Sequence, residues 1–314
     1  MDEAVGVVRF RPAPDFDRLR AIMHEDPKEV IAQGKHFLTH TQLDKLTQAR
    51  TYNLLCYTAA CVLKRSTVEA AYHGHEAVEL ARSLEGVEAK ALLFDSLVNF
   101  GTASERIGEY ERAINAYREA MAMPLDWIDR RHHEEAVITY LGRALYYKGD
   151  YQDALTAFDQ ASNLARLRQD PYAEEFLHGM RGMCHLRMGN PEAAHHYMAQ
   201  AASVTNDETR YELRPKGRIL GNMAIVAYMR GDVAQAQAYA NAVLDIAREI
   251  DDPHGLVDGH MVLALCHQAN RRVQQATESA AEASRVAFAY GYVPLIQDMS
   301  WLLTHLYVQR RGSC

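Results

Sequence analysis

Histidines and carboxylates are the side chains of this sequence that could ligate a metal ion or catalyse a reaction. Residues 132–135 read His-His-Glu-Glu, whereas a zinc-protease helix places two histidines four residues apart around a glutamate. The pairs His73/His75 and His195/His196 have no cysteine or carboxylate at ligand spacing. Neither a phosphate-binding glycine loop nor a Gly-x-Ser-x-Gly nucleophile motif occurs. The sequence therefore predicts no catalytic residue, no metal site and no cofactor.

Paired carboxylates are present, but they stand where helices are expected to begin. The pairs are Glu134-Glu135, Glu174-Glu175 and Asp251-Asp252. Negative side chains in a first helical turn interact favourably with the helix dipole. We therefore interpret these pairs as helix-start residues rather than as an acid–base site.

A short phrase recurs along the chain and indicates which elements position the remaining side chains. It combines a glycine with alanines at helical spacing, as in Gly108-Glu109-Tyr110 followed by Ala113 and Gly149-Asp150-Tyr151 followed by Ala154. The marker alanines recur every 40 to 43 residues, at Ala70, Ala113, Ala154, Ala194, Ala236 and Ala276. Such a period is typical of a solenoid, in which each unit buries its apolar face against its neighbours.

Each period divides into two helices. Apolar residues recur at i, i+3, i+4 and i+7, and Gly108, Gly149, Gly189 and Gly231 fall at the break. In the third unit we expect helices over residues 94–107 and 110–123. Asp-Pro pairs at residues 26, 170 and 252 provide an N-cap and a first-turn proline. The predicted fold class is all-α.

Small residues recur eight places into the first helix, at Gly101, Gly142, Gly182, Ala224 and Ala264. Since an interior glycine costs about 1 kcal/mol relative to alanine, these positions indicate close helix packing. Together with Ala113, Tyr117 and Ala120, and with the equivalent Ala154, Phe158 and Ala161, this pattern resembles the tetratricopeptide repeat. The resemblance covers roughly residues 50–285 and implies a right-handed superhelical α-solenoid.

The usual period of that family is 34 residues, and this chain needs about 40. Units of this length are similar to those of RRNPP-type peptide-pheromone sensors and of some signal-transduction ATPases. Residues 1–48 are too short and too weakly basic for the helix-turn-helix domain of the DNA-binding members. We expect a flexible arm over residues 1–14, a solenoid of six to seven helix pairs over 15–290, and a C-terminal capping helix and tail over 291–314.

The resemblance places the first helix of each pair on a concave face. Outward positions on these helices mix tyrosine, methionine, asparagine and arginine, which is neither a purely solvated nor a purely packed pattern. The candidate peptide-binding residues are Asp95, Asn99, Thr102, Arg106, Tyr140, Arg143, Tyr146, Tyr147, Phe176, Met180, Arg187, Arg218, Asn222, Ile225 and Tyr228.

Each of these residue types has a use against an extended peptide. An asparagine amide both donates and accepts, so Asn99 and Asn222 could hold a peptide backbone, as similar asparagines do in the pheromone sensors. Arginines such as Arg143 could pair with a carboxylate in bidentate fashion. Aromatic rings supply contact area at low entropic cost. Several of the tyrosines and methionines could equally pack between repeats, and this alternative stays open.

Composition narrows the class of partner. The formal net charge of −7 over 314 residues disfavours a nucleic-acid surface. No apolar run reaches a membrane span, the start of the chain lacks the features of a signal peptide, and five unevenly spaced cysteines suit a reducing cytoplasm. We expect a cytoplasmic protein with a peptide or protein partner. Self-association through the C-terminal helix stays open.

The sequence thus favours a non-catalytic, regulatory module that binds an extended peptide in its concave groove. One alternative is a passive scaffold that uses its convex face or its ends. An enzyme embedded in the repeats is the alternative of a different class.

Overall fold

The protein forms a stack of antiparallel helix pairs in the computed structural model, which describes residues 16–63, 68–124, 130–203, 213–291, 293–300 and 304. Within these residues no strand occurs, which confirms the all-α prediction. The helices are α1 (Phe16–Ala21), α2 (Pro27–His40), α3 (Lys45–Tyr57), α4 (Val68–Arg82), α5 (Val87–Arg106), α6 (Tyr110–Ala122), α7 (Arg130–Lys148), α8 (Tyr151–Arg168), α9 (Pro171–Arg187), α10 (Pro191–Ser203), α11 (Leu213–Met229), α12 (Val233–Glu249), α13 (Pro253–Ala269) and α14 (Val273–Tyr290).

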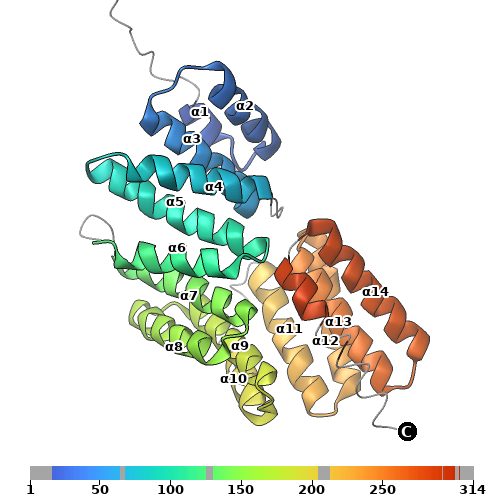
Figure 1. Cartoon of the computed structure of the whole chain (residues 1–314). Helices are drawn as coiled ribbons and strands as arrows, with labels where there is room; N and C mark the ends of the chain where they lie inside the picture. Colours follow the sequence, from blue (N-terminus) through green and yellow to red (C-terminus); the bar gives the residue numbers. More distant parts are fainter. Residues whose placement is uncertain are drawn as a thin grey trace, which may run out of the picture.

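Consecutive helices pack on one another along the whole array, so that α3 to α14 form successive pairs. Figure 1 shows α1–α10 stacked in order and α11–α14 beside the later part of that stack, at the level of α6–α10. A π-helix (Thr58–Val62) continues α3, and residues 293–300, which follow α14, are also α-helical. The predicted arm over residues 1–14 and most of the predicted tail lie outside the described residues.

The helices are longer than the sequence pattern predicts, and this accounts for the long period. The first helix of the third unit begins at Val87 rather than at residue 94, while the turn to α6 keeps only three residues. The glycines at the four breaks, Gly108, Gly149, Gly189 and Gly231, all have positive φ angles, between +76° and +102°. That backbone region is the one that glycine adopts most readily. The predicted break positions are therefore confirmed.

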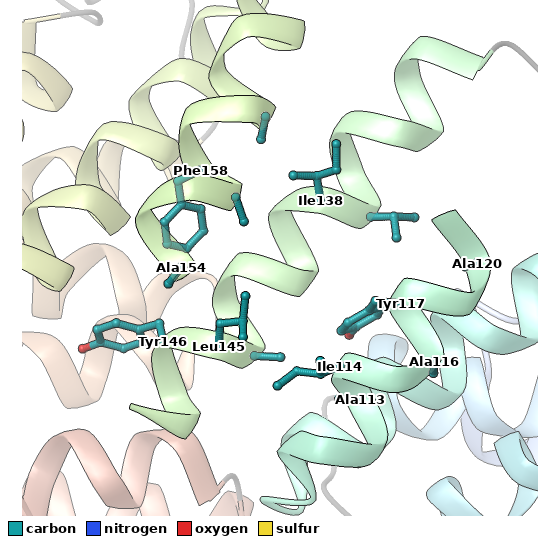
Figure 2. Close-up of a cluster of buried hydrophobic side chains, with 14 of the residues drawn as sticks. Ala113, Ile114, Ala116, Tyr117, Ala120, Ile138, Leu145, Tyr146, Ala154 and Phe158 are labelled. Carbon is teal, nitrogen blue, oxygen red and sulfur yellow. The ribbon is translucent and has the colours of Figure 1, made fainter. Parts of the chain in front are cut away.

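The largest core cluster runs through α5 to α9, and Figure 2 shows its centre. Tyr117 on α6 and Phe158 on α8 are both fully buried. A Cβ atom on Gly101 would lie 2.6 Å from the Tyr117 ring, and one on Gly142 would lie 2.7 Å from the Phe158 ring. Burial of such a ring stabilises the fold by about 1.5–3 kcal/mol, so the repeated glycines make room for the main packing side chains.

The Asp-Pro pairs begin helices as expected. Pro27, Pro171 and Pro253 are the first residues of α2, α9 and α13. The Asp170 side chain accepts a hydrogen bond from the Ala173 backbone N–H at 3.1 Å, and Asp26 does the same for Glu29. No helix of the described part of the chain combines the length and apolar character needed to cross a bilayer.

Candidate binding groove

A groove of about 1060 Å³ runs along the inner side of the later repeats. Its walls come mainly from α7, α9, α11 and α13, with further residues from α5, α10, α12 and the helical segment 293–300. Ligand pockets typically measure about 300–1,000 Å³, so this groove is large enough for several residues of an extended chain. We call it the main groove.

Most of the predicted residues lie in the main groove, where the structure brings together side chains from α5, α7, α9 and α11. They are Arg106, Arg143, Tyr146, Tyr147, Phe176, Met180, Arg187, Arg218, Asn222, Ile225 and Tyr228. Aromatic and apolar side chains therefore line the groove together with four arginines and an asparagine, a combination that suits a ligand site.

The remaining predicted residues lie elsewhere. Asp95, Asn99 and Tyr140 line a second cleft of about 630 Å³ between α1, α3, α5 and α7. There the Asn99 amide donates a hydrogen bond to the Asn53 Oδ1 at 2.9 Å. Thr102 is buried, and its hydroxyl donates to the Val98 carbonyl at 3.0 Å. Equivalent repeat positions such as Asn99 and Asn222 thus face different cavities.

Two of the arginines in the main groove already hold buried carboxylates. Arg143 Nε and Nη2 both donate to Glu105, at 3.0 Å each, and the Glu105 side chain is fully buried. Arg218 Nη2 donates to Glu175 at 2.9 Å, and the Asn222 amide approaches the same carboxylate at 3.4 Å. A buried charge needs such a partner. These arginines therefore connect neighbouring repeats. The sequence predicts instead that they point outward and pair with a carboxylate of the ligand.

The interpretation of Glu134-Glu135 and Glu174-Glu175 as helix-dipole residues is wrong for the second member of each pair. Glu175 is 1% exposed, and burial raises the pKa of its carboxyl group while the Arg218 charge opposes that shift. Glu135 is also buried and accepts a hydrogen bond from Arg168 at 2.7 Å. Arginines 33 and 43 residues further along are the partners, so no local pattern in the sequence shows these bridges.

Carboxylates gather at one end of the main groove. Asp252, Asp258 and Asp298 all line it. The Asp258 side chain is exposed on the groove wall, although the surrounding protein reduces the hydration of its carboxyl group. This desolvation, with the negative charges of Asp298 and Asp252, raises its pKa to about 7. Burial also raises the pKa of Asp298, although its ion pair with Arg187 opposes the shift. Sequence reasoning did not select Asp298, because it lies in an apolar run beyond the last repeat.

Two glycines of α11 leave bare backbone on the groove wall. Gly217 and Gly221 are one helical turn apart and both line the groove. Among the described residues, a Cβ atom on Gly221 would meet no atom within 4 Å, and one on Gly217 would be in ordinary contact with Ile246 at 3.5 Å. Packing inside the protein therefore does not require a glycine at either position, unlike at Gly101 and Gly142.

Comparison with known proteins supports the fold. The tetratricopeptide repeat family matches residues 94–124, the unit in which the sequence pattern is strongest. A comparison with curated proteins gave no match.

Solved structures of Rap proteins have a similar arrangement of helices. The Rap conjugation gene regulator of the plasmid pLS20, solved with the Phr* peptide, is 16% identical, with a TM-score of 0.62 over 94% of this chain and 93% of that one. A Rap protein complexed with competence and sporulation factor is 14% identical, with a TM-score of 0.62 over 94% and 86%.

A third structure, aspartyl phosphate phosphatase F from Bacillus subtilis, is 14% identical, with a TM-score of 0.61 over 87% of this chain and 69% of that one. At these identities the likeness concerns the fold alone. The chain therefore carries a tetratricopeptide repeat within an all-α solenoid, and it shares its fold with the Rap proteins.

Proposed function

We propose that this protein is a regulatory receptor that binds an extended peptide segment in the main groove. The observation that carries the proposal is the bare backbone of α11 at Gly221. A helix-interior glycine costs about 1 kcal/mol relative to alanine, and none of the residues that the structure describes occupies the space beside Gly221. Glycine at such a position lets a ligand approach the helix backbone closely.

The side chains around Gly221 suit a peptide ligand. Asn222 follows directly and its amide oxygen can accept a hydrogen bond from a peptide N–H. Phe176, Met180 and Tyr228 offer apolar and amphipathic surface. The Rap structures with similar folds include one solved with the Phr* peptide, which supports the same class of ligand for this chain.

The ion pairs of Arg143 and Arg218 limit the part that ligand carboxylates can play in binding. Glu105 and Glu175 already satisfy Arg143 and Arg218, so the binding free energy comes chiefly from apolar contacts and from backbone hydrogen bonds. A ligand of this kind is an extended segment with apolar side chains rather than a strongly acidic one.

A bulky side chain at residue 221 tests the proposal directly. Linear peptides are first selected on the immobilised wild-type protein from a random library, and their affinities are measured by fluorescence anisotropy. The Gly221→Phe variant should lose at least about tenfold in affinity, because the new ring fills the groove, and its circular dichroism should match that of the wild type.

The matched control is Ala238→Phe on α12, where the same ring is added at an exposed position that does not line the groove. If both variants bind the selected peptides like the wild type, the ligand uses another surface and the scaffold alternative is favoured. If no peptide is selected, the receptor proposal fails.

A further inference from the structure

The helical segment 293–300 is packed against two distant parts of the array. On one side, Leu295 is buried in a cluster with Val257 of α13 and Val286 of α14. On the other side, the segment reaches α6, α7 and α9, which lie more than 100 residues earlier in the sequence. We call residues 293–300 the clasp.

The contacts of the clasp with the earlier helices are mostly polar. Tyr110 at the start of α6 donates a hydrogen bond from its hydroxyl to Gln297 Oε1 at 2.7 Å. Asp298 forms an ion pair with Arg187 at the end of α9 and accepts a hydrogen bond from the Tyr146 hydroxyl at 3.3 Å. Val293 touches the turn at Gly108. A contact of this kind can open without exposing a large apolar surface.

Several residues of these contacts also line the main groove. Tyr146, Arg187, Leu295 and Asp298 all belong to its wall. The clasp therefore forms part of the groove wall and connects α13 and α14 with α6, α7 and α9. Any ligand that touches both walls has a differential affinity for the closed state, which by linkage shifts the population toward it.

A second carboxylate lies near the ion pair of the clasp. Asp258 of α13 lies close enough to Asp298 for their negative charges to interact. Repulsion between these two carboxylates weakens the closed arrangement relative to an isolated Arg187–Asp298 pair.

From this geometry we infer that residues 293–300 are an opening clasp that sets the width of the main groove and couples its occupancy to the spacing of the two parts of the solenoid. The opening itself is a property of the chain alone. The coupling to a ligand rests on the proposed function.

The test compares three proteins by hydrogen–deuterium exchange of the amides in residues 293–300. The first is the wild type. The second, Asp298→Asn with Tyr110→Phe, loses the ion pair and the hydroxyl contact but keeps the shapes of both side chains. The third, Gly108→Cys with Val293→Cys, can form a disulfide, because the Val293 Cβ lies 3.5 Å from the place of a Cβ on Gly108, within the range of about 3.5–4.5 Å for disulfides.

Exchange in the clasp should be at least about tenfold faster in the double variant than in the wild type, since hydrogen bonds to charged groups are lost. It should be slowest in the oxidised cysteine variant and return toward the wild-type rate on reduction. The radius of gyration from small-angle scattering should increase only in the double variant. Native Cys56, Cys184 and Cys266 are buried, and burial raises the pKa of each thiol, so they compete little for the new disulfide.

Equal exchange in all three proteins would overturn the inference. So would loss of the whole array together with the clasp in the double variant, because the segment would then be an ordinary part of one cooperative core. In a further arm, a peptide selected on the wild type should slow exchange in the clasp. Binding without such slowing refutes the coupling while the proposed function stands, and the three-protein comparison decides the opening of the clasp even if no peptide binds.

Discussion

Glycine has opposite surroundings in two regions of this solenoid. In the packed region between α5 and α10, Gly101, Gly142 and Gly182 each lie against a large side chain of the following helix, with 2.6–2.7 Å from a virtual Cβ to Tyr117, Phe158 or Met198. In the groove region, Gly221 of α11 faces open space. The first set is required by internal packing, and the second residue is not.

This difference shows that one residue type carries two kinds of information in a repeat protein. A glycine that recurs at the same place in successive units reports the approach of two helices. A glycine that departs from that register, on the concave side, reports space kept free beside a helix backbone. The following predictions test whether the two regions differ in this way.

The largest effect is expected at Arg143, which lines the groove but holds the buried Glu105. Arg143→Met leaves that carboxylate without its main partner and should destabilise the protein by about 3–5 kcal/mol, the usual result of breaking a buried pair. Urea unfolding measures the change. The double variant Arg143→Met with Glu105→Gln should recover most of the lost stability. If Arg143→Met alone is as stable as the wild type, the groove wall is independent of the packed region.

Gly142→Ala comes next. The added methyl group would overlap the Phe158 ring, which is fully buried, and overpacking of this kind costs about 1–3 kcal/mol. The midpoint of urea unfolding should fall accordingly. A stabilised Gly142→Ala protein would mean that the ring can move aside and that the packed region is less tightly constrained than its geometry indicates.

The same substitution at Gly221 should have the opposite sign. Alanine is favoured over glycine in a helix interior by about 0.5–1 kcal/mol, and no atom stands in its way. The free energy of unfolding in urea should rise by that amount. A decrease would contradict the contrast with Gly142, because it would reveal a packing role for Gly221.

The smallest effect is expected at Asp258, whose side chain faces the water of the groove. Its pKa of about 7 in the folded protein exceeds the ordinary value of 3.8, so the folded state holds more protons than the unfolded state between about pH 4 and pH 7. The wild type therefore loses this contribution to stability as the pH rises through that window. Asp258→Asn should melt higher than the wild type at pH 8 and close to it near pH 4, as measured by differential scanning fluorimetry. A constant difference between the two pH values would refute the shift.

The fold was accessible from the sequence because its signals are local and repeated. The breaks at Gly108 and Gly149, the Asp-Pro helix starts and the small residue opposite each packing side chain all follow from patterns within one unit. The sequence pattern underestimated the length of α5. Its residues before Phe94 carry none of the recurring small or aromatic residues of the repeat, and they belong to a helix that packs against α4.

The site was only partly accessible. The choice of outward positions on the first helix of each repeat selected Tyr146, Phe176 and Asn222, which do line one groove. It could not show that Arg143 and Arg218 pair with Glu105 and Glu175, because each bridge joins residues about 40 positions apart. It also could not show that Asp298 returns to Arg187, since this contact depends on the curvature of the whole array.

Photo-crosslinking tests the central claim most directly, namely that an extended peptide lies in the main groove. A peptide selected on the wild-type protein is made with a benzoylphenylalanine at each position in turn, irradiated in the complex, and mapped by mass spectrometry. The account predicts crosslinks to residues of α9, α11 and α13 that line the groove, such as Met180, Ile225 and Met261. Crosslinks confined to residues that do not line the groove, such as those of α8 or Ala238 of α12, would contradict it.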